Sequence, residues 1–315
     1  MRVEVHSCRW FLVLVLAVAA GCSRLPPMQQ APVQAKSVAE LQDYLRTHKE
    51  DVELFRMRGP FAVAERTDVE LRTGPNERVS ADIYLSSAPE KAPVVLLVHG
   101  YDSSKEAHAN QAVHVASWGL HVLAIQLPRK GPWGGSNGRL LARVANLVRR
   151  SPEAIDARVD PGKIILAGHS FGGNAAAIAL GEGAPALGGV LLDPAAIGRD
   201  MPKIIQRIGR PVMVLGADET LGTTRNREYF YRYIRSGIGE VSIRDATHDD
   251  GQWPSQYALQ NYGSDPYTTE EAQLTFAAAL TASAMSLATT GGFDAAWASF
   301  EPDLKSGRLF NAKRK

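Results

Sequence analysis

The sequence predicts an α/β fold in which a mostly parallel β-sheet is covered by helices on both faces. Five short apolar runs lack the polar–apolar alternation of a strand with one wet face. They begin at Pro93, His121, Lys163, Gly188 and Pro211. Segments with helical periodicity, such as 139–151 and 226–234, lie between them. Strands buried on both faces that alternate with helices are typical of parallel sheets.

The residues that flank these runs predict further elements. Ser37 has capping-box spacing to Glu40, and one helical face of apolar residues continues to Phe55, so we predict a packing helix over 37–55. In 79–86 apolar and polar residues alternate, which predicts antiparallel N-terminal strands over 61–73 and 79–86 with one wet face.

The C-terminal part predicts a last strand over 241–248 and an alanine-rich closing helix over 268–287. The final residues, 313–315, are all basic and are interpreted as a solvated tail. No internal repeat or second domain boundary is found, so residues 37–315 are expected to form a single domain.

The composition indicates a folded protein rather than a disordered or nucleic-acid-binding one. Of 315 residues, 45% are hydrophobic and 22% are charged, close to globular averages. The formal net charge is only +2. A nucleic-acid binder held by a basic surface needs a larger positive excess, so no nucleic-acid partner is expected.

The N-terminus has the pattern of an export signal. Arginines at positions 2 and 9 precede an apolar run from Trp10 to Ala20, which is too short to span a bilayer. The following AVAAGC resembles the cleavage box of bacterial lipoproteins. That resemblance implies a signal peptide over 1–21 and lipidation of Cys22.

Residues 22–36 are rich in proline and glutamine and are interpreted as a tether. The resemblance therefore implies a protein of the bacterial cell envelope that meets the membrane through a lipid anchor. Ser23 directly after the cysteine fits delivery to the outer membrane. The alternative is an ordinary cleaved secretory signal.

The strongest motif is G-x-S-x-G at 168–172, between a predicted strand and an alanine-rich helix. In a nucleophile elbow the serine occupies a sharp turn above the sheet, and small neighbours let strand and helix backbones approach closely. Gly168 and Gly172 hold these two positions, so Ser170 is the candidate nucleophile. The alternative is a structural glycine-rich turn.

A serine nucleophile needs a general base, and His248 is the only one of eight histidines that follows Ser170. It comes at the end of the last predicted strand, in the chain order that this architecture uses. Two other interpretations stay open for His248, namely a surface side chain and a metal pair with Asp250. His169, beside the nucleophile, is interpreted as a packing residue that points away from Ser170.

Two aspartates are candidates for the acid that orients the base, because each ends a predicted strand between Ser170 and His248. Asp193 closes GGVLLDP and Asp218 closes PVMVLGAD. We favour Asp193 and keep Asp218 as the alternative.

The oxyanion of an acyl-transfer intermediate needs preorganised N–H donors. One is expected from the residue after the nucleophile, Phe171. The other is expected from Tyr101, in the loop after the first parallel strand. The loop over 128–138, with Trp133, is expected to border the pocket.

The chain resembles the α/β-hydrolase superfamily over about residues 57–290. The segments GPFAV, HGYDSS, GHSFGG and ATH are similar to dienelactone-hydrolase-like and cutinase-type esterases. Dienelactone hydrolases proper use a cysteine nucleophile, whereas this chain has Ser170. The resemblance implies a serine esterase that acts on small-molecule esters and needs no metal, organic cofactor or obligate protein partner. An amidase or peptidase with the same triad, or a non-catalytic envelope lipoprotein, are the alternatives.

Overall fold

The computed structural model describes six segments of the chain. They are residues 28–48, 53–127, 135–221, 227–260, 267–289 and 292–315. The expected signal peptide, Cys22, Ser23 and Trp133 lie outside them. Within the described residues, no helix is both long enough and apolar enough to cross a membrane.

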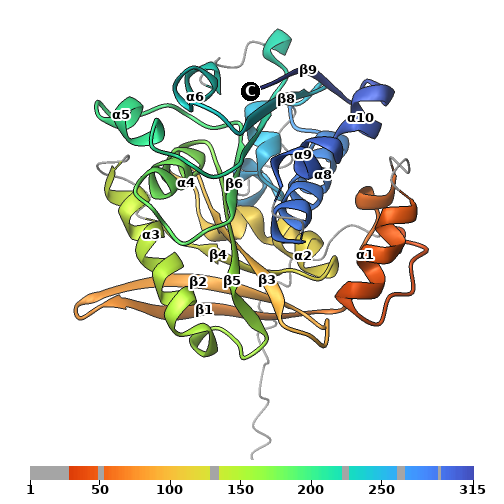
Figure 1. Cartoon of the computed structure of the whole chain (residues 1–315), viewed down its shortest axis with the longest axis horizontal. Helices are drawn as coiled ribbons and strands as arrows, with labels where there is room; N and C mark the ends of the chain where they lie inside the picture. Colours follow the sequence, from red (N-terminus) through yellow and green to blue (C-terminus); the bar gives the residue numbers. More distant parts are fainter. Residues whose placement is uncertain (1–27, 49–52, 128–134, 222–226, 261–266, 290–291) are drawn as a thin grey trace, which may run out of the picture.

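The described residues form one nine-stranded sheet in the order β1-β2-β4-β3-β5-β6-β7-β8-β9 (Figure 1). The pairs among β3 to β8 are all parallel, while β1, β2 and β9 join antiparallel at the two edges. This confirms the predicted fold class. The strands are β1 Val63–Gly74, β2 Glu77–Ser86, β3 Ala92–Val98, β4 His121–Ile125, β5 Val159–His169, β6 Gly188–Leu192, β7 Val212–Gly216, β8 Ile238–Ile243 and β9 Leu309–Arg314.

Helices cover the sheet on both sides, and alternate side chains of each strand pack into one or the other of two hydrophobic cores. In β3, Val95 and Leu97 face one core, and Val94, Leu96 and Val98 face the other. The first core is closed mainly by α2 and α8, and the second by α3 and α4 (Figure 1). The longer helices are α1 Val38–Thr47, α2 Ala109–Ser117, α3 Gly135–Arg150, α4 Phe171–Gly181 and α8 Glu270–Thr289. The short ones are α5 Met201–Ile205, α6 Arg227–Tyr233, α7 Gln256–Leu259, α9 Phe293–Ala298 and α10 Glu301–Ser306, with 3-10 turns η1 Leu54–Arg56, η2 Lys105–His108, η3 Pro152–Ala154, η4 Glu219–Leu221 and η5 His248–Gly251.

The predicted N-terminal helix is shorter than expected. Ser37 caps α1 by accepting a hydrogen bond from the backbone N–H of Glu40, as its spacing predicted. The Glu40 carboxylate, however, accepts from Lys36 rather than closing the box on Ser37. The helix ends at Thr47, and Phe55 lies in the separate turn η1.

The wet face predicted for the second strand is wrong for its C-terminal half. Asp82, Tyr84 and Ser86 are all buried. Asp82 forms an ion pair of 2.9 Å with the buried Lys105 ammonium in η2. Asp82 is therefore covered by a charged partner from η2 and does not face water.

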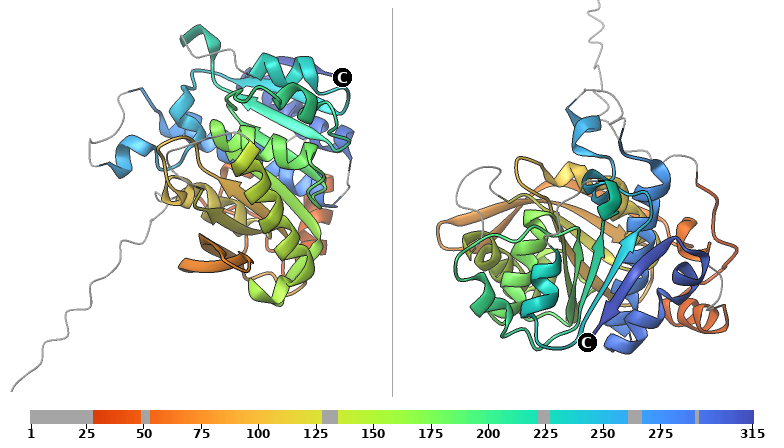
Figure 2. Two further views of the ribbon diagram at one scale, coloured as in Figure 1. Left: turned by 90° about the vertical axis from the view of Figure 1, so that its left-hand side faces the viewer. Right: turned by 90° about the horizontal axis from the view of Figure 1, so that it is seen from above.

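The C-terminal basic residues are not a solvated tail, which corrects the sequence interpretation. Residues 309–314 form β9, which pairs antiparallel with β8 at the sheet edge, as the right-hand view of Figure 2 shows. Lys313 reaches the buried Glu240 carboxylate at 3.1 Å, and the Arg314 guanidinium lies 5.4 Å from the centre of the Trp297 ring. These charges therefore have partners on the neighbouring strand β8 and on α9.

Candidate active site

Ser170 occupies a strained turn between β5 and α4. Its backbone angles are φ 54° and ψ −121°, a conformation that a residue with a side chain seldom adopts. Its N–H donates to the Leu192 carbonyl at 3.0 Å, and its own carbonyl accepts from Ala195 at 3.0 Å. Neighbouring strand β6 therefore holds the turn in place.

The glycines of the motif are required by the close approach of two backbones. A Cβ on Gly172 would lie 2.4 Å from the Val98 carbonyl oxygen at the end of β3. A Cβ on Gly168 would lie 2.5 Å from the Gly172 carbonyl carbon. Neither position can hold a side chain unless the backbone moves, as expected for a nucleophile elbow.

His248 and Asp193 meet at the same end of the sheet. His248 begins turn η5 after β8, and Asp193 follows β6 with a φ of 35°. The His248 Nδ1 and an Asp193 carboxylate oxygen, Oδ2, are 2.6 Å apart. The other Asp193 oxygen, Oδ1, accepts from the Ala217 N–H at 3.0 Å. The carboxylate is 6% exposed and the imidazole 38% exposed, so the acid is buried while the imidazole reaches the surface.

Asp218, the alternative acid, lies in a different set of contacts. One of its oxygens, Oδ1, accepts from the N–H and the hydroxyl of Thr220 at 3.0 and 2.7 Å. The other, Oδ2, accepts from the Asp245 N–H at 3.1 Å. Burial raises the pKa of Asp218, but these hydrogen bonds outweigh it and the pKa lies below its ordinary value. Asp218 ties the loops after β7 and β8 together.

Asp250, the metal-ligand alternative beside His248, is also engaged by backbone donors. One oxygen, Oδ2, accepts from the N–H of Thr247 at 2.7 Å, and the other, Oδ1, accepts from the N–H of Thr269 at 2.9 Å. The carboxylate thus fixes the start of η5 against the start of α8. In the segments that the structure describes, no three His, Cys, Asp or Glu side chains gather in a metal-binding arrangement.

The two residues expected to supply the oxyanion donors lie together. The Tyr101 and Phe171 rings pack edge to face with centroids 5.8 Å apart. Between them, a Cβ on Gly100 would lie 3.0 Å from the Ser170 Cβ, so the loop after β3 passes directly over the nucleophile. Ser103 donates to Gln252 at 2.7 Å, which ties this loop to the residue that follows η5.

His169 makes contacts that the sequence interpretation did not include. Besides packing, its ring centroid lies 4.5 Å from that of His248, and its Nε2 is 2.8 Å from the His248 carbonyl oxygen. Its side chain is buried. The sequence signal was its place at the end of a buried strand, where a polar ring needs a partner.

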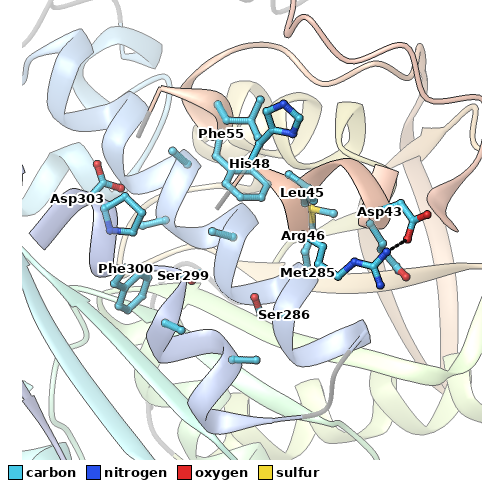
Figure 3. Close-up of a pocket in the computed structure, with 18 residues that line it drawn as sticks. Asp43, Leu45, Arg46, His48, Phe55, Met285, Ser286, Ser299, Phe300 and Asp303 are labelled. Carbon is cyan, nitrogen blue, oxygen red and sulfur yellow. Dashed lines mark hydrogen bonds and ion pairs between the residues drawn. The ribbon is translucent and has the colours of Figure 1, made fainter. Parts of the chain in front are cut away.

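A cavity of about 550 Å³ lies away from this group of residues, between α1, α8, α9 and α10 (Figure 3). Alanines of α8 and α9 form much of its wall, together with Leu45, Phe55 and Met285. Asp43 and Arg46, which form an ion pair of 2.8 Å, lie at one end, and Asp303 lies at the other. None of its lining residues belongs to the Ser170, His248 and Asp193 group, so we place the chemistry at the sheet end and not in this cavity.

The comparison with protein families identifies the class of this chain. The model of the alpha/beta hydrolase family matches residues 95–305, which include Ser170, Asp193 and His248. The chain therefore belongs to the alpha/beta hydrolase family and has the fold of a hydrolase. None of the curated proteins matches it.

Proposed function

We propose that the protein is a serine hydrolase that cleaves carboxylic esters through an acyl-enzyme at Ser170. In this proposal His248 is the general base, Asp193 orients it, and the N–H groups of Tyr101 and Phe171 receive the oxyanion. The proposal is carried by the 2.6 Å contact between His248 and Asp193, together with the strained elbow turn that holds Ser170.

The Asp193 contact decides which nitrogen of His248 can act as a base. An ionised carboxylate only accepts hydrogen bonds, so the proton of the neutral imidazole resides on Nδ1. Nε2 then carries the free electron pair. It takes the Ser170 proton as the hydroxyl oxygen attacks the ester carbonyl, and it returns that proton to the leaving alcohol. Water then attacks the acyl-enzyme by the same route and releases the carboxylic acid.

The pH dependence follows from the environment of His248. Burial lowers its pKa, but the hydrogen bond to Asp193 and the charges of Asp193 and Asp249 together raise it above the ordinary 6.5. Because the base acts only when neutral, kcat/KM should rise with pH and reach half its plateau above pH 6.5. Steady-state measurement of kcat/KM for a soluble ester over about pH 5 to 9 tests this expectation. A half-plateau pH below the ordinary value would contradict the assignment of His248 as an Asp193-paired base.

The similarity of GHSFGG and HGYDSS to dienelactone-hydrolase-like and cutinase-type esterases supports esters over amides as substrates. Small or medium soluble esters are the substrate class that we propose. An amidase or peptidase with the same triad is the second candidate.

The direct test is intact-mass labelling of the protein with a fluorophosphonate, with the Ser170→Ala variant beside it. We expect one probe on the wild type and none on the variant, because only a serine activated by its base attacks the phosphorus. A paired ester and amide of one acid, assayed on the same sample, should give much faster ester cleavage. A folded wild type that takes up no probe would refute the serine-hydrolase proposal, and faster amide cleavage would favour the amidase.

For the N-terminus we propose a lipoprotein signal peptide over 1–21 and lipidation of Cys22, which anchor the enzyme to the bacterial envelope. The support is the AVAAGC box after the apolar run. Cells grown with an alkyne-tagged palmitate should label the wild type and leave the Cys22→Ser variant unlabelled. Equal labelling of both proteins would favour the ordinary secretory signal.

A further inference from the structure

One side chain lies in contact with all three parts of the proposed catalytic machinery. His169 is the last residue of β5 and directly precedes Ser170. The centroids of the His169 and His248 rings are 4.5 Å apart. A Cβ built on Gly100, in the loop that carries Tyr101, would lie 3.4 Å from the His169 Nδ1. His169 is thus placed between the nucleophile turn, the oxyanion loop and the turn of the base.

The contacts of the His169 ring fix its tautomer. Nε2 lies 2.8 Å from the His248 carbonyl oxygen, which can only accept, so Nε2 carries the proton. Nδ1 is buried and has no hydrogen-bond partner among the described residues, as suits a nitrogen without a proton. Burial, and then the nearby His248 and His108, hold the pKa of His169 well below its ordinary value. The ring is therefore a neutral donor.

The same ring also supports the far end of the base turn. Gly251, the last residue of η5, packs closely against the His169 ring, since a Cβ there would lie 2.5 Å from the ring carbon Cδ2. The Gly251 carbonyl accepts from the Gln111 side chain at 3.0 Å, and Gln111 is in turn held by His108 at 2.6 Å. The carbonyls of the first and last residues of η5, His248 and Gly251, therefore both accept hydrogen bonds from buried side chains.

We propose that His169 is a positioning residue, whose Nε2–H donates to the His248 carbonyl and whose ring packs against Gly251, so that the His248 imidazole stays between Asp193 and Ser170. The catalytic consequence rests on the proposed serine-hydrolase function. The positioning itself does not, because it is a statement about turn η5 and the contact between His248 and Asp193.

The test compares His169→Leu, which removes the donor, with His169→Gln, whose amide nitrogen can replace Nε2. We expect His169→Leu to lower kcat about 100-fold with little change in KM, because the base is misplaced by a fraction of an ångström to one ångström. His169→Gln should restore kcat to within about threefold of wild type, because it keeps the donor. Gly251→Ala should lower kcat in the same way, because it pushes the turn off the ring from the other side, and it serves if His169→Leu does not fold.

A matched control is His114→Leu. His114 is also buried, and its Nε2 lies 2.8 Å from the Phe55 carbonyl, outside the proposed site. The His114→Leu variant loses an equivalent hydrogen bond, so we expect a similar loss of stability and an unchanged kcat. If His114→Leu lowered kcat as much as His169→Leu, general destabilisation would be the cause and the proposal would be overturned.

A readout independent of turnover is the downfield proton resonance of His248 Nδ1–H, identified by its loss in Asp193→Asn. We expect it in the wild type and in His169→Gln, and we expect it broadened or lost in His169→Leu. Retention of both the resonance and kcat in His169→Leu, or absence of the resonance from the wild type, would overturn the proposal. A wild type that shows this pattern but neither labels with fluorophosphonate nor cleaves esters would refute the proposed function and leave the positioning inference standing.

Discussion

Replacing Asp193 with asparagine is expected to lower kcat/KM for an ester about 10⁴-fold. The carboxylate selects the Nδ1–H tautomer of His248 through a 2.6 Å contact and stabilises the imidazolium that forms as the serine attacks. An asparagine amide can donate to Nδ1 instead, which would place the proton on Nε2, the nitrogen that must accept from Ser170. The measurement is steady-state kinetics on a soluble chromogenic ester, normalised to the fraction of folded protein.

The matched control is Asp218→Asn, the same change at the other strand end. Its carboxylate accepts hydrogen bonds from the backbone N–H groups of Thr220 and Asp245. We expect a loss of about 1–2 kcal/mol in unfolding free energy, from weakened charge-assisted hydrogen bonds, and a kcat/KM within a few-fold of wild type. If the two variants lost activity equally, or Asp218→Asn lost more, Asp193 would not be the acid.

The elbow was predictable from the sequence because its constraint is local. A serine that must occupy a turn between strand and helix needs small neighbours within two residues, and Gly168 and Gly172 supply them. The candidate base could also be named from the sequence, since one histidine alone follows Ser170. The choice between Asp193 and Asp218 was not, because both end parallel strands at the same edge of the sheet. The choice depends on which aspartate His248 reaches. The position of His248 is set by turn η5, and neither strand determines it.

The contact of His169 with His248 was not predictable from the sequence for a related reason. Its partner is a backbone carbonyl 79 residues away, and a carbonyl leaves no trace in residue identity. The predictions of solvent exposure for Asp82 and for the basic C-terminus were wrong for another reason. The sequence shows that a residue is charged, but not which side chain covers it. Lys105 covers the first, and the Glu240 carboxylate of β8 pairs with Lys313 at the sheet edge. Pairing of this kind lets a charged residue lie where a wet face is predicted.

Replacing Gly172 with alanine is expected to reduce the free energy of unfolding by about 2 kcal/mol. Alanine is favoured over glycine inside a helix by about 1 kcal/mol, so sequence preference alone would predict a gain. In the structure, however, the new Cβ would lie 2.4 Å from the Val98 carbonyl oxygen and 2.5 Å from that of His99. Both are backbone atoms that cannot turn aside, so β3 and α4 must separate at a cost of about 3 kcal/mol. Because α4 begins at Phe171 and β3 leads into Gly100, the same separation should widen the gap between the two oxyanion donors and lower kcat.

Urea denaturation of Gly172→Ala beside Gly209→Ala measures the effect. Gly209 is exposed, its backbone needs no left-handed conformation, and a Cβ there meets nothing within 4 Å. Its replacement should change the unfolding free energy by less than about 0.5 kcal/mol. The two variants share the same added methyl group and differ only in what surrounds it, so an equal m-value with a lower midpoint in Gly172→Ala assigns the loss to the native contact. A Gly172→Ala protein as stable as Gly209→Ala would mean that the strand and the helix do not meet at the elbow, and Ser170 would then lack the turn on which its proposed role depends.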